Sequence, residues 1–293
     1  MKRVRVVLAL LVSTCFASAQ QRPRITGIAQ VRLYTASPDS SSSFYGKVLG
    51  FDRTAIGGAS VYTVNNLQSI EVAPLPSPAP SSRLMAVVFR TTDAPALEKY
   101  LQTHSIAIAQ PLDHGTFGVH DPEGNLILFT QSTTDAQHRS PRATSRRIIH
   151  AGFVVKNHDV EDRFYRDLLG FHLYWKGGQK DGALDYVAMQ VPNGSDWLEY
   201  MLNTRAEATA RQLGGANHLS LGVTHMSDAV DALGRNGCTG PNCAKTQLGR
   251  DGKMQLNEFD PDQTRVEFME FKPVSTPCCS PIAGKTPAEK EDR

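Results

Sequence analysis

The chain has 293 residues, of which 40% are hydrophobic and 20% charged, enough apolar material for one or two globular cores. The formal net charge is only +2, and the lysines and arginines are scattered along the sequence. A protein that binds nucleic acid usually gathers such residues into a basic stripe, so the composition argues against nucleic acid as a partner.

The first 19 residues have the layout of a secretory signal peptide. A basic start is followed by an apolar run from Val6 to Val12 and by small residues up to Ala19. The run is too short for a membrane span. We favour simple export over a lipoprotein signal ending at Cys15, because Thr14 is a poor residue before a lipidated cysteine. The sequence therefore predicts a periplasmic or secreted protein without a membrane span.

After the signal, the first half of the chain reads as strand, helix and strand, twice in succession. Apolar residues alternate in the predicted strands and recur at helical spacing in the predicted helices. The segments are a strand at 28–35, a helix around 44–51 and a strand at 67–75, then a strand at 83–90, a helix at 93–101 and a closing strand within 121–129.

Two segments of polar composition divide the mature chain. The stretch at 131–147 is rich in Ser, Thr and Arg, which is typical of a linker. We place the linker at 136–147, between domains at 25–135 and 148–273. The tail at 274–293 has a similar composition, and we expect little fixed structure there.

The second half repeats the order of the first. A strand, a helix with an acidic start and three further strands form one module, and a strand, a helix and a last strand belong to another. The segments are 147–155, 159–171, 172–177, 184–191 and 196–202, followed by 217–223, 226–237 and 264–271.

Short motifs recur between the halves. "FYGKVLGF" at 44–51 returns as "FYRDLLGF" at 164–171, 120 positions later. "DAPAL" at 93–97 resembles "DAVDAL" at 228–233, and "DPEGN" near the end of the first half resembles "DPDQT" near the end of the second. Internal repeats of this kind indicate duplicated supersecondary units. The chain thus divides into four βαβββ modules, an α+β architecture.

Four cysteines remain after the predicted signal peptide: Cys238, Cys243, Cys278 and Cys279. In an exported protein a structural disulfide is the favoured interpretation. Cys238 and Cys243 are spaced to close a small loop, whereas we expect that the adjacent Cys278 and Cys279 cannot easily pair. Cross-pairing between loop and tail stays open, and no C-x-x-C spacing indicates a zinc or redox site.

The four modules, with "FYxxxLGF" in odd modules and "DPxxxxxE" near the end of the last, resemble the vicinal oxygen chelate superfamily. This superfamily includes glyoxalase I, bleomycin-resistance proteins and extradiol dioxygenases. The resemblance covers nearly all of 25–272 and implies two glyoxalase-like domains, whose paired modules curve mixed sheets into a funnel. It also implies metal ligands on the first and last strands of each module, here His150, Glu199, His218 and Glu267. Their order looks most like bacterial glyoxalase I.

The period of two along a strand leads to the same residues. Glu199 alternates with Leu198 and Tyr200, Glu267 with Val266 and Phe268, and His218 with leucines. Carboxylates buried in such strands are costly unless they are compensated, and one divalent cation would neutralise two of them. A lone strand histidine is more often a hydrogen-bonded core residue than a ligand, so the interpretation rests on the four candidates together. We regard Glu270, which points to the opposite face, as a poorer ligand, and His158, His172 and His225 as structural or solvated.

The corresponding positions of the first half hold Gln30, Glu71, Arg83 and Leu128. Arginine and leucine cannot bind a cation, so we expect this half to have kept the fold and lost the site. It would then serve for packing or for shaping the substrate pocket. We hypothesise that Arg83 pairs with Glu71.

Four protein ligands leave two adjacent positions of an octahedral metal, enough to chelate two neighbouring oxygens of a substrate. The natural reaction is proton abstraction next to a carbonyl through an enediolate. By resemblance to glyoxalase-like enzymes, Glu267 or Glu199 would be the base. We therefore predict a lyase or isomerase that uses one divalent ion, without distinguishing among zinc, nickel, manganese, cobalt and iron.

Two alternatives remain open at this point. An extradiol iron dioxygenase usually has a three-ligand site, which Glu199 argues against. A binding protein of the bleomycin-resistance type would sequester a small molecule without metal. Asp251 and Lys253 either line the funnel mouth or are solvated turn residues. The expected partner is a small-molecule substrate, and the protein is a monomer or a homodimer.

Overall fold

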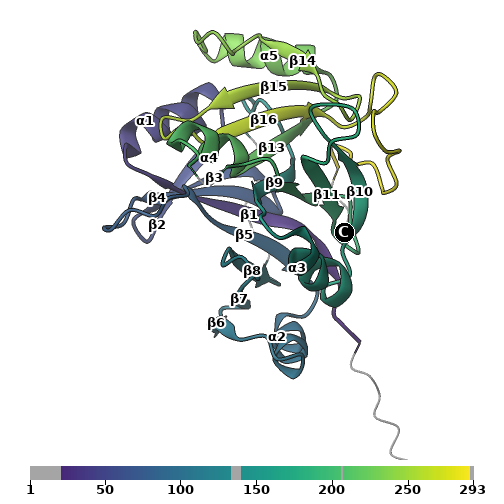
Figure 1. Cartoon of the computed structure of the whole chain (residues 1–293). Helices are drawn as coiled ribbons and strands as arrows, with labels where there is room; N and C mark the ends of the chain where they lie inside the picture. The colour runs from purple at the N-terminus through teal and green to yellow at the C-terminus, as the bar shows by residue number, and fades with distance from the viewer. Residues whose placement is uncertain (1–20, 133–139, 206, 291–293) are drawn as a thin grey trace, which may run out of the picture.

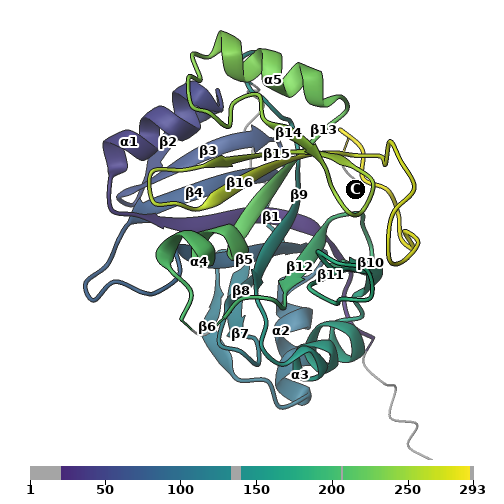
Figure 2. The ribbon, with the colours of Figure 1, turned by 45° about the horizontal axis from the view of Figure 1, so that its top comes forward.

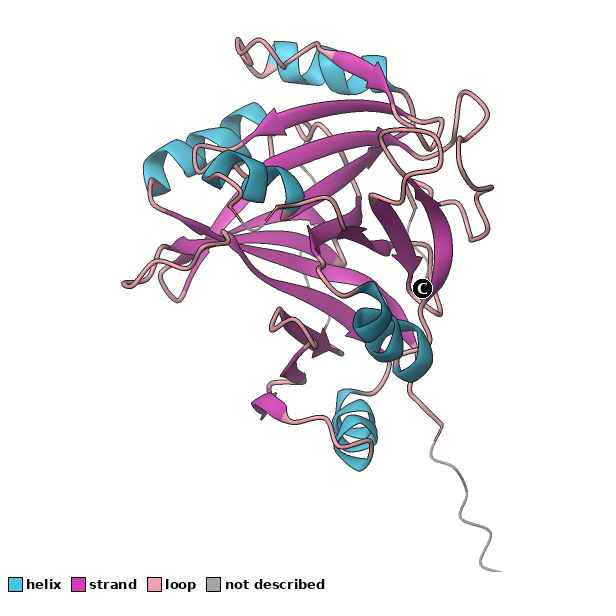
Figure 3. Ribbon diagram, in the orientation of Figure 1, coloured by secondary structure: helices cyan, strands magenta, loops and turns pink. Residues whose placement is uncertain are grey.

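The computed structural model describes residues 21–132, 140–205 and 207–290. Two curled mixed sheets of eight strands make up the molecule, one from each half of the chain (Figure 1). Helices are few and lie at the periphery of the sheets (Figure 3). The predicted signal peptide and residues 136–139 of the predicted linker lie outside the described residues. None of the described helices has the length and apolarity to cross a membrane.

The first sheet has the strand order β2-β3-β4-β1-β5-β8-β7-β6. The parallel pairs β1 with β4 and β5 with β8 close the two βαβββ modules, and β1 and β5 join them in antiparallel fashion. The elements are β1 (Ile25–Thr35), α1 (Pro38–Ser42), η1 (Ser43–Val48), β2 (Asp52–Ile56), β3 (Ala59–Asn65), β4 (Gln68–Pro74), β5 (Leu84–Thr91), α2 (Ala94–Thr103), β6 (Ile108–Asp113), β7 (Thr116–His120) and β8 (Leu126–Thr130).

The second sheet repeats this order as β10-β11-β12-β9-β13-β16-β15-β14. Here β9 pairs with β12 and β13 with β16 in parallel, and β9 and β13 join the modules. The elements are β9 (Ile148–Val154), α3 (His158–Asp162), η2 (Arg163–Leu168), β10 (His172–Gly177), β11 (Tyr186–Gln190), β12 (Trp197–Met201), α4 (Ala210–Ala216), β13 (His218–Val223), α5 (Met226–Arg235), β14 (Thr246–Leu248), β15 (Met254–Phe259) and β16 (Arg265–Glu270).

The four predicted modules are confirmed, and both copies of the repeated motif adopt the same structure. Each motif forms a π-helical turn, η1 or η2, and then reaches a glycine with a φ of +74°. Only glycine adopts this left-handed conformation without strain, so Gly50 and Gly170 end the helical segments and turn the chain into the next strand.

The repeated motifs also connect the halves. The hydroxyl of Tyr165 donates to Asp121 in the first half at 3.0 Å, and the hydroxyl of Tyr45 donates to Asp260 in the second half at 2.9 Å. Each helix therefore packs against the "DP" turn of the other half, and Figure 2 shows α1 beside the ends of β15 and β16. One hydrophobic cluster includes buried residues from both sheets.

The C-terminal tail differs from the predicted disordered segment. The amide of Val274 donates to Gly252 O and that of Cys278 to Arg250 O, both at 2.8 Å, and Ala283 donates to Tyr174 O on β10. The side chain of Arg147 reaches Ala288 O at 2.8 Å. The backbone of an edge strand has unpaired polar groups that another segment can satisfy. Ser280 and Ala283 take this role beside β10, where they bond to Lys176 and Tyr174, which composition alone does not indicate.

The cysteines form two disulfides. Cys238 bonds to Cys243, in agreement with the favoured small loop, with the Cα atoms 5.9 Å apart. Cys278 bonds to its neighbour Cys279. The expectation that adjacent cysteines cannot easily pair is therefore wrong for this chain, because the tail turns sharply here, with Cys279 at a φ of +76°.

Candidate metal centre

The four candidate ligands lie on four consecutive strands of the second sheet, β12, β9, β13 and β16. Register brings them into two neighbouring rows. In one row Ser220 lies between His150 and Glu267, and in the next Gly152 lies between Glu199 and His218. Since side chains two positions apart share a face, all four candidates project from the same face of the sheet.

The donor atoms of these residues converge. His150 Nε2 is 3.0 Å from His218 Nε2 and 3.1 Å from Glu267 Oε2. Glu199 Oε2 is 3.3 Å from His218 Nε2 and 3.8 Å from His150 Nε2. Both histidines are fully buried, and the exposed fractions of the Glu199 and Glu267 side chains are 13% and 3%. The structure thus brings together all four residues that the sequence singled out.

Gly152 makes room for this convergence. A Cβ atom at this position would lie 2.1 Å from Cε1 of His218, far inside contact distance. Any larger residue would push the imidazole out of the centre. The "HAGF" sequence that contains His150 therefore also supplies the gap that the second histidine fills.

The hydrogen bonds of His218 fix its tautomer. Its Nδ1 donates to Ala216 O at 2.9 Å, so Nε2 carries the lone pair that faces the centre. Burial lowers the pKa of His218, and the nearby Arg265 guanidinium lowers it further. The ring of His150 stacks on Trp197 with the centroids 4.7 Å apart, which fixes its orientation. Both imidazoles are thus held with Nε2 toward the carboxylates.

Both carboxylates favour the ionised form. Burial opposes ionisation of Glu267, but the Arg265 guanidinium and His150 outweigh it and lower the pKa of this carboxyl. Burial likewise opposes ionisation of Glu199, and its contacts with His218 and His150 lower its pKa. Yet Glu267 Oε2 is buried without a hydrogen bond among the described residues. A buried oxygen of this kind requires compensation.

These residues fit a divalent cation. Two imidazole nitrogens and two carboxylate oxygens form a mixed donor set that suits zinc, nickel, manganese, cobalt or iron. Donor atoms of His150, Glu199 and His218 all lie within 4.8 Å of one another. Glu267 Oε2, which lies 3.1 Å from His150 Nε2, would gain a bound cation as a further partner.

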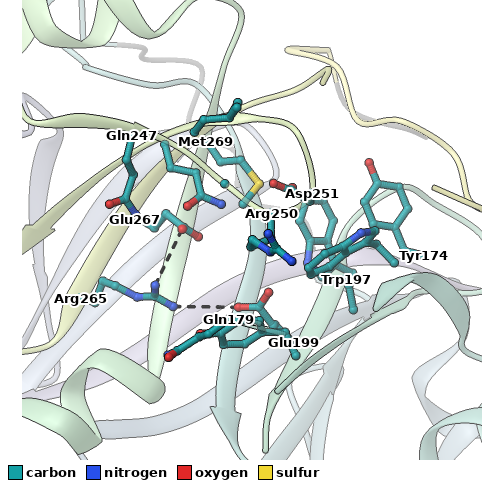
Figure 4. Close-up of a pocket in the computed structure, with 16 residues that line it drawn as sticks. Tyr174, Gln179, Trp197, Glu199, Gln247, Arg250, Asp251, Arg265, Glu267 and Met269 are labelled. Atoms are coloured by element: carbon teal, nitrogen blue, oxygen red, sulfur yellow. Dashed lines mark hydrogen bonds and ion pairs between the residues drawn. The ribbon is translucent and has the colours of Figure 1, made fainter. Parts of the chain in front are cut away.

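Arg265 also belongs to the centre, and the sequence reading missed it. It precedes Glu267 by two residues on β16 and so shares its face. Its NH2 group is 2.8 Å from His218 Nε2 and 3.9 Å from Glu199 Oε2, and its NH1 group is 3.8 Å from Glu267 Oε1. Figure 4 shows the guanidinium pointing between the two carboxylates. The period of two could have indicated it.

A pocket of about 270 Å³ opens over the centre. One wall is aromatic, since Trp197 stacks on Tyr174 with the centroids 4.8 Å apart, next to Trp175 and Tyr186. The other lining residues are Gln179, Ala188, Glu199, Gln247, Leu248, Gly249, Arg250, Asp251, Gln255, Arg265, Glu267 and Met269 (Figure 4). The pocket therefore combines an apolar wall with a charged floor.

Asp251 and Lys253, for which the sequence left two roles open, are both buried. Asp251 lines the pocket, and burial raises its pKa to about 6. Lys253 is fully buried behind the aromatic wall, donates to the Tyr174 hydroxyl at 3.0 Å and has its pKa lowered to about 8 by burial. Neither residue is a solvated turn residue.

The remaining candidates lie away from the centre. Glu270 lies toward helix α5 and accepts a hydrogen bond from Met226 N at 2.7 Å. His225 is the N-cap residue of α5, His158 begins α3, and His172 on β10 contacts Gln190. These histidines have the structural roles that the sequence reading gave them.

The first half contains no comparable set of donors at the matching positions. Gln30 and Arg32 on β1 correspond to His150 and Gly152, and Glu71 pairs with Arg32 at 3.3 Å. Register places Ala86, not Arg83, at the position of His218. The predicted Arg83–Glu71 pair is therefore wrong, and Arg83 instead lies 3.5 Å from Asp262 of the second half. Leu128 lies in a small apolar cluster with Ala86 and Val88.

Comparisons with solved structures find the same fold. Homoprotocatechuate 2,3-dioxygenase from Brevibacterium fuscum, in complex with 3,4-dihydroxyphenylacetate, is similar with 19% identity and a TM-score of 0.64, over 85% of this chain and 82% of that chain. A room-temperature structure of an extradiol ring-cleaving dioxygenase from B. fuscum has the same identity and TM-score, over 85% and 73% of the two chains. At this identity the likeness shows the fold.

No curated protein matches the chain. The family model described as Glyoxalase/Bleomycin resistance protein/Dioxygenase superfamily matches residues 27–129 and 147–274. The two matched segments correspond to the two sheets, and together they cover most of the chain. The chain therefore belongs to the Glyoxalase/Bleomycin resistance protein/Dioxygenase superfamily.

Proposed function

We propose that this protein is a divalent-metal-dependent lyase or isomerase that acts on a small molecule with vicinal oxygens. The convergence of two imidazoles and two carboxylates at the floor of a pocket carries the proposal. A bound divalent cation would polarise the substrate oxygens and stabilise the charge that develops when a proton leaves the adjacent carbon.

The protein residues would move that proton. Glu199 and Glu267 both line the pocket, and both have lowered pKa values, so each is available as a base. Each carboxylate would have to leave the cation to accept the proton, and both lie close to the histidines, so Glu267 and Glu199 are both candidates for the base. The stacked rings of Trp197 and Tyr174 would hold the rest of the substrate and exclude water.

Solvent exchange tests the reaction class. The protein reloaded with zinc, nickel, manganese, cobalt or iron should transfer deuterium from D₂O into a 2-hydroxy ketone or 2-oxo acid, as followed by proton NMR. Glu267→Gln and Glu199→Gln should each be compared with the parent at matched metal content. A loss of about 100-fold or more in one variant would identify the base. A Glu267→Gln protein with bound metal and full exchange would remove Glu267 from the role.

An extradiol-type iron dioxygenase is the second candidate. Its support is the similarity in fold to dioxygenases over 85% of the chain, together with the two histidines and one carboxylate of His150, His218 and Glu267. Oxygen consumption by the iron-loaded protein with 3,4-dihydroxyphenylacetate would favour this candidate. Deuterium exchange without oxygen consumption would favour the lyase or isomerase.

We also propose that the enzyme acts outside the cytoplasm. The support is the basic start, apolar run and small residues of the first 19 positions. The amino-terminal sequence of the protein recovered from the exporting cell would test this, with cleavage after Ala19 as the expected result.

A further inference from the structure

Among the described residues, the side chain of Arg265 contacts the candidate metal ligands His218, Glu199 and Glu267 and no other charged group. Its side chain is 17% exposed, and its Nε is buried without a hydrogen bond among the described residues. Its carboxylate contacts, at 3.8 and 3.9 Å, are longer than direct charge-assisted hydrogen bonds. Its one short contact is with His218 Nε2, at 2.8 Å. The guanidinium therefore depends on the histidine for its position.

A cation and Arg265 would compete for that nitrogen. His218 donates its Nδ1 hydrogen to Ala216 O, so Nε2 has a single lone pair for either a metal ion or the guanidinium. When a metal takes the lone pair, the guanidinium loses its short contact. Because Arg265 lines the pocket, the released group would lie beside the substrate.

The first half gives a contrasting case. Arg32 there lies 3.3 Å from Glu71 and donates to Gln30 Oε1 at 2.6 Å. In the described part of the chain, no histidine stands beside these two partners to complete a metal site with them. Arg32 is therefore held in place by Glu71 and Gln30 of its own sheet. Arg265 is held only by groups that a metal would engage.

The sum of the charges at the pocket floor then indicates the charge of the substrate. Of the charged residues that line the pocket, Arg250 pairs with Asp181 and Asp251 lies beside Lys253. That leaves two negative charges on Glu199 and Glu267 and one positive charge on Arg265. With neutral imidazoles, as ligation requires, a divalent ion brings the net charge of the loaded floor to plus one. A monoanion balances this charge, whereas a neutral molecule does not.

We infer that Arg265 selects monoanionic substrates that chelate through two neighbouring oxygens, of which a 2-oxo carboxylate is the simplest. The inference rests on the proposed function and names its substrate class. The guanidinium binds the ionised oxygen of the substrate, and the aromatic wall receives its apolar end.

Binding measurements with Co²⁺ test this without any activity assay. Pyruvate and 2,3-butanedione have nearly the same shape, but only pyruvate is charged. Co²⁺ affinity is measured by calorimetry, and ligand affinity by the visible spectrum of the bound Co²⁺. The proteins are the parent, Arg265→Gln, and Arg53→Gln as a control, since Arg53 is an exposed arginine on β2 of the other sheet. We expect Arg265→Gln to bind Co²⁺ about tenfold more tightly and pyruvate about tenfold more weakly, with butanedione unchanged.

The outcomes separate the two proposals. If parent and variant both fail to bind Co²⁺, the proposed function is wrong and the inference falls with it. If both bind Co²⁺ and show equal affinity for pyruvate, the inference is overturned and the metal centre stands. Equal affinity of the parent for pyruvate and butanedione also overturns the inference. Co²⁺ binding by Arg265→Gln itself demonstrates that the variant is folded.

Discussion

The two halves of the molecule share a fold and differ at the floor of their sheets. Around β9, one half holds His150, His218 and the gap of Gly152, whereas around β1 the other half has Gln30 and Arg32 at the matching positions. Apolar Val88 and Leu128 complete the first floor. A few substitutions on one face thus separate a candidate metal centre from a face with an apolar cluster and an arginine–glutamate pair, while the strand order is identical.

The scaffold contacts, by contrast, are common to both halves. Tyr45 with Asp260 and Tyr165 with Asp121 are equivalent hydrogen bonds that cross between the halves. Likewise, Asp262 accepts from Ala36 N, and Glu123 accepts from Lys156 N. The comparison teaches that the repeated "FYxxxLGF" and "DP" motifs specify the assembly of the two sheets, and that the strand residues between them specify the site.

The largest effect should follow from closing the gap at Gly152. The substitution Gly152→Ala places a Cβ atom 2.1 Å from Cε1 of His218 and should displace the ring. We expect metal affinity to fall by about 10–100-fold while the sheet persists. Co²⁺ titration and circular dichroism check this. Gly215→Ala, where nothing lies within 4 Å, is the matched control; unchanged affinity in Gly152→Ala would refute the role of the gap.

The stability of the second half should depend on pH in a way that the first half does not share, because Glu161 replaces the equivalent Ser41. Glu161 is fully buried where the equivalent residue is Ser41, and burial, with the charges of Asp121, Glu123 and Asp162, raises its pKa to about 8. Tyr165 and Tyr200 also lie near the Glu161 carboxyl. The folded protein therefore keeps a proton between pH 4.5 and 8 that the unfolded chain releases, so stability falls as pH rises through this window.

The substitution Glu161→Gln removes this dependence. It should raise the free energy of unfolding at pH 8 by about 1–2 kcal/mol and change it little at pH 4.5. Urea unfolding at the two pH values checks the prediction. Asp159→Asn, on the same helix with a side chain 90% exposed, is the control. A parent protein whose stability increases from pH 4.5 to 8 relative to Glu161→Gln would contradict the assigned pKa.

The smallest effect should follow from replacing Arg32, the arginine on the floor of the first sheet. Arg32 and Glu71 are 29% and 18% exposed, so solvent weakens their attraction. Arg32→Met should cost at most about 1 kcal/mol of stability and leave the metal content unchanged. Thermal unfolding and elemental analysis measure the two quantities. A change in metal content would indicate that the first half contributes to the centre.

Much of the fold was predictable because the sequence is periodic. The repeated motifs placed all four modules. The resemblance to the vicinal oxygen chelate superfamily, supported by alternation along the strands, singled out His150, Glu199, His218 and Glu267, which the structure brings together. Alignment of the halves failed at Arg83. The pairing register of β1 with β5 places Ala86 opposite Arg32, and no pattern in "RLMAVVFR" reveals this register.

The rest depended on contacts between distant segments. Lys253 lies in a glycine-rich loop, and only the packing of Tyr174 and Trp197 over it explains its burial. The tail is ordered by hydrogen bonds to β10 and to the loop at 249–252, which its composition does not disclose. The period of two places Arg265 on the same face as Glu267, but arginine is not a metal ligand and so does not belong to the predicted ligand set.

Elemental analysis of the purified protein tests the central claim, that one half holds a metal and the other does not. The parent is compared with a His150→Ala, His218→Ala variant and with a Gln30→Ala, Glu71→Ala variant of the first half. After incubation with divalent ions, we expect about one equivalent of a transition metal in the parent and in the first-half variant, and almost none in the histidine variant. A parent that binds no metal, or a histidine variant that keeps it, would contradict the account.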